Sequence, residues 1–155
     1  MGILTDVFVA TEEEMAAADF TLGVPTDLLP VIEAKGVDTV PLGVLNALVS
    51  AQHLGDTEAD VQAFVAGLER DFPCVRDLGE HWVHHLLDSL TMRLAQFAPT
   101  EIERVGAQWA RTEELGGPNA ATSYVAGIVD YLGRLCRLCA QAAQDDKNVY
   151  MWISL

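Results

Sequence analysis

The chain has 155 residues, half of them hydrophobic, so it is long enough to bury a real core in one domain and does not have the composition of a disordered chain. Its net charge is −14, which would repel phosphate backbones and argues against nucleic-acid binding. The apolar runs fall short of the ~20 residues that a membrane span needs, and the first residues lack the basic start and cleavage site of a signal peptide. We therefore expect a cytoplasmic protein with no membrane association.

The acidic residues are concentrated at the start of the chain. Residues 1–60 contain eleven acids and a single base, Lys35, so this part carries −10 and the remainder −4. The acids are Asp6, Glu12, Glu13, Glu14, Asp19, Asp27, Glu33, Asp38, Asp56, Glu58 and Asp60. Such a surface commonly serves solubility. It also attracts a basic protein partner, which is the second interpretation.

The first 40 residues predict a strand, a short helix and a long connection. Ile3 to Ala10 is rich in β-branched and aromatic residues, which favour a strand. Thr11 and Glu14 form a capping box, which predicts a helix that runs to about Asp19. Two glycines and two prolines between residues 20 and 40 predict a connection without regular structure.

Two helices are expected next. Asp38, Thr39 and Pro41 predict a helix start, and the helix should end between His53 and Gly55. A second capping box, Thr57 with Asp60, begins a helix that ends near Phe72 and Pro73. The residues predicted to face inward from this second helix are Val61, Phe64, Val65 and Leu68.

The segment Pro73 to Leu78 suits either a third strand or a loop. Apolar residues at helical spacing then predict a helix from Gly79 to Phe97. A third box, Thr100 with Glu103, predicts another helix that Gly116, Gly117 and Pro118 terminate.

The end of the chain predicts a long helix, Asn119 to Gln144, followed by an apolar strand, Val149 to Leu155. The polar residues of the helix fall on one narrow line, so we expect other elements to surround it. That line consists of Ser123, Asp130, Arg134, Arg137, Gln141 and Gln144. Pairing of the terminal strand with Ile3 to Ala10 would cover its apolar face and one edge.

These elements predict one domain, residues 1–155, of the α+β class. We expect it to be predominantly helical, with about six helices around a central C-terminal helix and a small sheet that pairs the N- and C-terminal strands.

His81, His85 and Asp88 are the best metal candidates. On the predicted helix they are spaced four and three residues apart, so they would project from one face and offer two imidazoles and a carboxylate to zinc or iron. The same face is opposite the apolar stripe and should point to solvent, where the histidines would simply be solvated. No other cofactor is indicated.

The three cysteines do not suggest a disulfide or a redox site. Cys136 and Cys139 form a Cys-x-x-Cys pattern in the middle of a predicted helix, away from a helix N-terminus that would lower a thiol pKa. Cys74 has no local pattern that would activate it. We expect buried, reduced thiols that pack as small apolar groups.

Three segments resemble a family of small bacterial proteins of unknown function. They are the start, Met1 to Ala10, the segment Lys35 to Leu42, and the ending, Tyr150 to Leu155. The resemblance implies a bacterial origin and no mechanism. Lys35 and Asp38 would be polar members of this pattern, with a role in ligand binding. Alternatively, Lys35 belongs to a turn with Gly36 and Asp38 caps the helix.

No catalytic motif is present in the sequence, so the favoured hypothesis is a small acidic binding or regulatory module without catalysis, similar to an immunity protein or an antitoxin, with a basic protein as partner. The alternative is a metal-dependent enzyme that uses His81, His85 and Asp88. Association into a homo-oligomer is also considered, provided that the terminal strand lies at a sheet edge.

Overall fold

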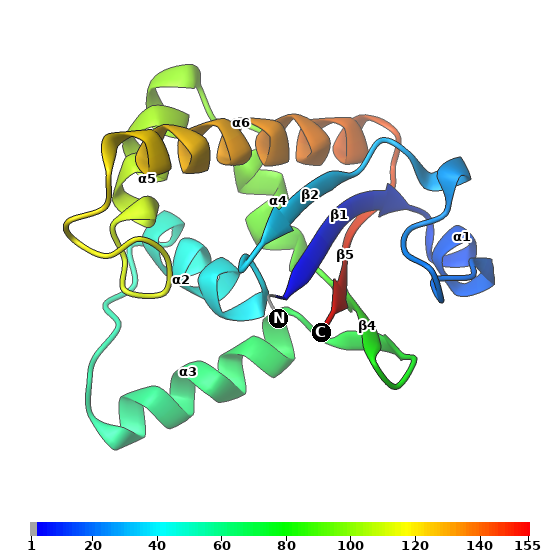
Figure 1. The fold of residues 1–155 in the computed structure, drawn as a ribbon, viewed down its shortest axis with the longest axis horizontal. Coiled ribbons are helices and arrows are strands. Elements are labelled where there is room, and N and C mark those ends of the chain that lie inside the picture. Colours follow the sequence, from blue (N-terminus) through cyan, green and yellow to red (C-terminus); the bar gives the residue numbers. More distant parts are fainter. Residues whose placement is uncertain (1–2) are drawn as a thin grey trace.

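The computed structural model describes residues 3–155 as a five-stranded antiparallel sheet with helices on both faces (Figure 1). Met1 and Gly2, which open the first of the three segments above, lie outside the described residues. The strand order is β2-β1-β5-β4-β3. The strands are β1 (Leu4–Ala10), β2 (Ile32–Lys35), β3 (Cys74–Asp77), β4 (His81–His85) and β5 (Asn148–Ser154). The helices are α1 (Glu12–Ala17), α2 (Thr39–Val49), α3 (Glu58–Asp71), α4 (Asp88–Leu94), α5 (Pro99–Ala110) and α6 (Thr122–Gln144), with a 3-10 turn, η1, at Thr26–Leu28.

The predicted pairing of the terminal strands is confirmed. β1 and β5 are antiparallel over their whole length, from Leu4 opposite Ser154 to Ala10 opposite Asn148. On its other side β5 pairs with β4, where His85 lies opposite Tyr150. The last strand is therefore the middle of the sheet and not its edge.

Both faces of β5 are buried, and this explains its continuous apolar sequence. Val149, Met151 and Ile153 point into the main core between the sheet and helices α2, α4, α5 and α6. Tyr150 and Trp152 point the other way, into a smaller core. That second core is closed by Phe8, Met15, Phe20, Leu28 and Val83, so α1 and the segment after it cover this face.

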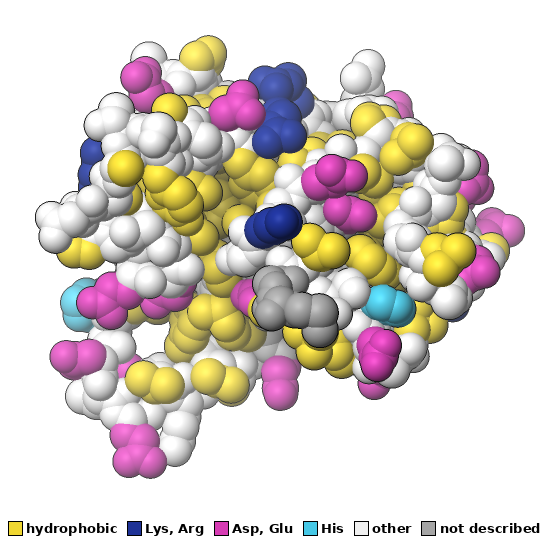
Figure 2. All heavy atoms as spheres, in the orientation of Figure 1, with side chains coloured by type: hydrophobic (Ala, Val, Ile, Leu, Met, Phe, Trp, Pro, Cys, Tyr) yellow, Lys and Arg dark blue, Asp and Glu magenta, His cyan; other side chains and the backbone are white. Residues whose placement is uncertain are grey.

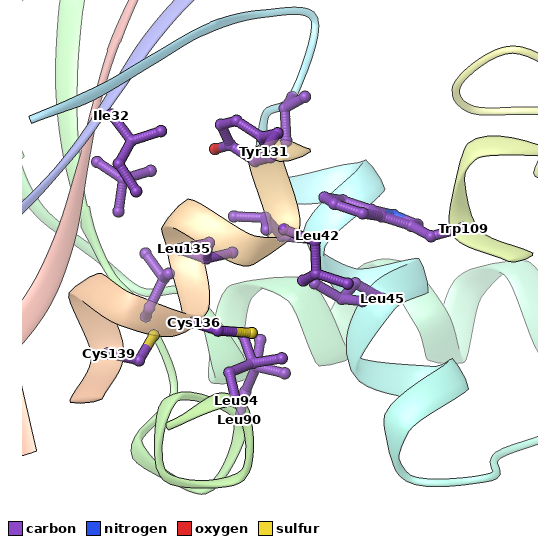
Figure 3. Close-up of a cluster of buried hydrophobic side chains, with 14 of the residues drawn as sticks. Ile32, Leu42, Leu45, Leu90, Leu94, Trp109, Tyr131, Leu135, Cys136 and Cys139 are labelled. Carbon is purple, nitrogen blue, oxygen red and sulfur yellow. The ribbon is translucent and has the colours of Figure 1, made fainter. Parts of the chain in front are cut away.

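Helix α6 lies across one face of the sheet (Figure 1). Its polar line is exposed, and its middle turns contribute Leu135, Cys136 and Cys139 to the main core (Figure 3). It is not a central helix with neighbours all round, because Tyr124 in its first turn is 40% exposed. Helices make up about half of the chain, so the prediction of a predominantly helical domain is wrong, and the sheet is larger than expected.

The helix predicted from Gly79 to Phe97 is wrong over its first half. His81–His85 is strand β4, paired with β5 on one side and β3 on the other, and only Asp88–Leu94 is helical. Trp82 and Val83 are residue types that suit strands, and Val83 is fully buried against Trp152. Two ladders of backbone hydrogen bonds outweigh the helical periodicity here, and Pro73–Leu78 contains a strand, one of its two alternatives.

The capping predictions hold at two of three helices. Thr11 and Thr57 accept from the amides of Glu14 and Asp60, and each acid bonds back to the threonine amide. The third box is misplaced by two residues. Helix α5 begins at Pro99, and the carboxylate of Glu101 accepts from the amide of Ala98 at 3.2 Å. The predicted connection between residues 20 and 40 contains η1 and β2, which were not predicted.

Among the helices of residues 3–155, none combines the length and apolarity required to cross a membrane.

Candidate functional site

Strand β4 carries two of the three predicted metal ligands, and its geometry separates them. Four residues of extended chain span about 13 Å, so His81 and His85 share a face of the sheet without meeting. His81 Nδ1 lies 3.0 Å from Ser154 Oγ, and its ring stacks on Trp152 with centroids 5.3 Å apart. Asp88 does meet His85, with Oδ1 3.3 Å from Nε2.

The metal hypothesis depended on helical spacing, which β4 does not have. Among residues 3–155 no group of three histidine, cysteine or acidic side chains has a geometry that could hold a metal ion. What the structure brings together is the pair His85 and Asp88, without His81. Two of the three predicted metal ligands therefore meet, and His81 does not join them.

Asp88 of this pair lines a groove of about 280 Å³ that has both polar residues, such as Lys147 and Asn148, and apolar ones, such as Met92 and Ala142, in its lining. The His85 ring contacts that of Tyr150, whose hydroxyl accepts from Asn148 Nδ2 at 3.2 Å. Burial raises the pKa of Tyr150, which keeps its hydroxyl protonated at neutral pH. The thiol in the lining of this groove, Cys139, has a pKa that burial raises, so this thiol is not activated as a nucleophile.

Two buried polar atoms have no hydrogen-bond partner among residues 3–155: Nε2 of His85 and the hydroxyl of Tyr131. The His85 atom is near Asp88 but is not aligned for a hydrogen bond. Tyr131 lies in the main core, where its hydroxyl points toward Ile32 (Figure 3). Burial raises the pKa of Tyr131 strongly, so this group is a neutral core side chain.

Lys35 and Asp38 lie where the sequence predicted a turn and a helix cap, respectively. Gly36 adopts a positive φ of 72° directly after β2, which ends at Lys35. Asp38 is the N-cap of α2 and accepts from the amide of Val40 at 2.9 Å. Asp38 therefore has a structural role as a helix cap, and Lys35 is an exposed residue at the end of the strand that precedes the turn.

The cysteines have no geometry for redox chemistry. Cys136 and Cys139 are buried in the main core (Figure 3), and burial raises the pKa of Cys136 to about 12 and that of Cys139 further. Cys74 is exposed on the edge strand β3, and partial burial of its sulfur raises its pKa as well. All three thiols are therefore protonated at neutral pH.

Most of the acidic side chains form no ion pair within residues 3–155. Within residues 3–155, four of the 23 carboxylates form ion pairs, namely Glu14, Asp71, Asp88 and Asp130. Figure 2 shows acidic side chains over much of one face and basic side chains at only a few points. Two of the remaining acids lie in α1, three lie in α3, and the others are distributed over the rest of the chain. The helices α1 and α3 are far apart in Figure 1.

Helix α3 is attached to the molecule by a narrow contact. It contains no buried residue, and in Figures 1 and 2 it extends from the body at the lower left, with a hollow beside it. Phe64 and Leu68 pack against the main core, whereas Val61 and Val65 are each 51% exposed. The prediction that all four residues face inward is therefore wrong for the two valines.

Clefts lie on both sides of this contact. One, of about 410 Å³, is formed by α2, α3 and the loop between them, and includes Asp60 and Asp71. The other, of about 510 Å³, runs from the last turns of α3 to the sheet and is lined by Thr39, Leu68, Glu69, Phe72, Pro73, Cys74 and His84. The sequence could not indicate these clefts, because they depend on how far α3 stands from the sheet.

Comparison with protein-family models, with curated proteins and with solved structures gives no match to this chain. The resemblance to a bacterial family of unknown function therefore stays an expectation from the sequence.

Proposed function

We propose that this protein is a small acidic binding module, without catalysis of its own, whose partner is a basic protein. The observation that carries the proposal is the unbalanced surface: 19 of 23 carboxylates, by subtraction of the four above, have no ion-pair partner among residues 3–155. A negative potential that is not neutralised internally steers a cationic partner and speeds its encounter. Immunity proteins and antitoxins are examples of such modules.

The main alternative is that the charge serves solubility only. Two features favour binding. The net charge is uneven along the chain, −10 in residues 1–60 and −4 in the rest, and α3 presents exposed valines where a protein that needs only solubility would place polar residues.

The proposal is tested by affinity capture. Tagged protein is incubated with extract of its native host at low salt, and bound proteins are released with a salt step. A basic protein recovered in stoichiometric amount, and lost above the salt concentration at which surface charges are screened, is the expected result. A variant with Glu12, Glu13, Glu58 and Glu69 changed to glutamine is the control and should recover much less. Recovery of no basic protein at low salt would contradict the proposal.

A metal-dependent enzyme is the second candidate, and the one observation that favours it is the contact of 3.3 Å between His85 and Asp88. Elemental analysis of protein purified without a chelator or a histidine tag decides it. Stoichiometric zinc, iron or manganese that is lost in His85→Ala would support this candidate, and absence of all three removes it.

A further inference from the structure

Helix α3 has an apolar stripe of which only one half packs against the core. At 100° per residue, Phe64, Leu68, Val61 and Val65 follow one another within about 100°, the width of a stripe that normally faces a core. The inner half, Phe64 and Leu68, contacts the core next to α2. The outer half, Val61 and Val65, is exposed, so the sequence of α3 provides for a second neighbour that residues 3–155 do not supply.

The open half has an acidic border. On the same helical projection Glu58 and Glu69 follow directly after Val65, and both side chains are exposed without an ion-pair partner among residues 3–155. Residues 56–71 contain five acids and one base, Arg70. That base is bound to Asp71, with Nε 2.7 Å from Oδ1, so it does not neutralise the border.

The cleft of about 510 Å³ continues this surface toward the sheet. Leu68 belongs both to the stripe and to the cleft. Phe72, the C-cap residue that follows α3, also lines the cleft, but it is 1% exposed and belongs to the core. Val61, Val65 and Leu68 are spaced four and three residues apart, which is the spacing of a seam along which a second helix packs. We call these three residues, with Glu58 and Glu69, the α3 seam.

The charge of the α3 seam selects its occupant. A second copy of this chain would bring its own acids against Glu58 and Glu69, and an anionic lipid surface or a nucleic acid would be repelled in the same way. A helix with apolar residues at heptad spacing and lysine or arginine beside them meets both requirements, the apolar half-stripe and the acidic border.

We infer that the α3 seam is the docking site for a cationic amphipathic helix, the binding element of a basic partner. This inference rests on the proposed function and adds to it the place and the mode of binding. The partner's apolar residues lie along Val61 and Val65 and enter the cleft beside Leu68, and its cations pair with Glu58 and Glu69.

The location is tested with an 18-residue peptide of leucine at heptad spacing and lysine elsewhere, added to protein with ¹³C-labelled valine and leucine methyl groups. The seam predicts that the methyl signals of Val61, Val65 and Leu68 shift together and saturate with one peptide per chain. Shifts centred on other methyl groups, such as those of Val24 and Val31 near α1, would overturn the inference and leave the proposed function in place. Absence of any shift would count against both.

Two matched double variants measure how much the acidic residues of α3 and of α1 contribute to peptide binding. Glu58→Gln with Glu69→Gln, and Glu12→Gln with Glu13→Gln on α1, each change the net charge by two. We expect the first pair to weaken peptide binding about tenfold and the second by less than about twofold, because exposed ion pairs act locally. Equal losses from the two pairs would overturn the seam as the site, since the peptide would then respond to net charge alone.

For the apolar part, Val65→Asn is compared with Ala66→Asn, an exposed residue outside the apolar stripe of the same helix, 100° around the axis from Val65. Affinity should fall about fivefold for Val65→Asn and stay unchanged for Ala66→Asn. Circular dichroism shows whether α3 remains folded in both. Sedimentation of the free protein adds one further outcome: a dimer that Val65→Asn dissociates would show that the occupant is a second copy and overturn the inference.

Discussion

Single polar atoms join distant segments of this chain. The indole nitrogen of Trp109 donates to the carbonyl of Pro41 at 2.9 Å, and that of Trp152 to the carbonyl of Phe20 at 3.2 Å. Arg76 donates to the carbonyls of Met15, Ala16 and Ala18 at the end of α1, with 2.6 Å to Ala18. These bonds satisfy buried groups, and they fix α1 and α5 against partners that are far away in sequence.

Replacing a glycine by alanine adds one methyl group, and two helical glycines differ in whether there is room for it. A Cβ at Gly127 in α6 meets no atom within 4 Å, whereas one at Gly43 in α2 would overlap Leu68 and lie 3.1 Å from Phe64. Gly127→Ala should therefore stabilise the protein by about 0.5–1 kcal/mol, because alanine favours a helix. Gly43→Ala should not increase the stability in this way, because the added methyl group would displace Leu68 and with it α3. Urea unfolding measures both, and an equal gain at Gly43 would show that α3 does not lie close against α2.

Asp6 gives a prediction on pH. Partial burial raises the pKa of its carboxyl group, and Glu33, opposite it in the β1–β2 pair, raises it further. The folded state therefore holds this proton more tightly than the unfolded state, and the contribution to stability falls as the pH rises through the folded pKa. Asp6→Asn should stabilise the protein at pH 7.

The gain from Asp6→Asn should shrink toward pH 4, where the carboxyl group of the natural protein is protonated in a larger share of molecules. Asp56→Asn, in the exposed loop before α3, makes the same change in net charge and is the control. The urea midpoint at the two pH values is the measurement. A gain that is the same at both, or that Asp56→Asn reproduces, would contradict the account of Asp6.

At the scale of elements, the sequence predicted what local rules determine. Threonine caps at α1 and α3, the Asp38 cap of α2, and the pairing of the terminal strands follow from hydrogen-bonding chemistry and apolar pattern. Strand β4 could not be predicted in this way. Its apolar spacing suits a helix, and only its place between β3 and β5 makes it a strand.

The candidate site was less predictable than the fold for the same reason. His85 and Asp88 were expected together and do meet, but His81 was expected with them and lies beside Ser154. The exposure of Val61 and Val65 could not be predicted from the sequence, because the apolar stripe of α3 includes these valines together with Phe64 and Leu68. Apolar periodicity predicts that a helix has an apolar face. It does not predict whether the surface that packs on this face belongs to the same chain or to another one.

Strand β5 gives the prediction that belongs to this scale. Deletion of Val149 to Leu155 removes the partner of both β1 and β4 and one layer of each core, so cooperative thermal unfolding should be lost. Deletion of Leu155 alone, which follows β5 and is 65% exposed, is the control and should leave the transition in place. A longer deletion that melts like the full chain would show that the sheet does not depend on β5.

At the scale of the whole molecule, one helix is open, because it alone among the helices of residues 3–155 has no buried residue. The sheet ends in two strands of four residues each, β2 and β3, which offer little edge for further pairing. The condition for self-association through β5 is not met, because β5 is paired on both sides. The open element is α3, and it is acidic as well as apolar.

The central claim is that this acidic surface binds a cationic amphipathic partner, and a calorimetric titration tests it most directly. The leucine–lysine peptide is titrated into the protein at moderate salt, next to a peptide of the same length and leucine spacing with glutamate in place of lysine. The account predicts one-to-one binding of the lysine peptide that weakens as salt rises, and no binding of the glutamate peptide. Equal binding of both peptides, or of neither, would contradict it.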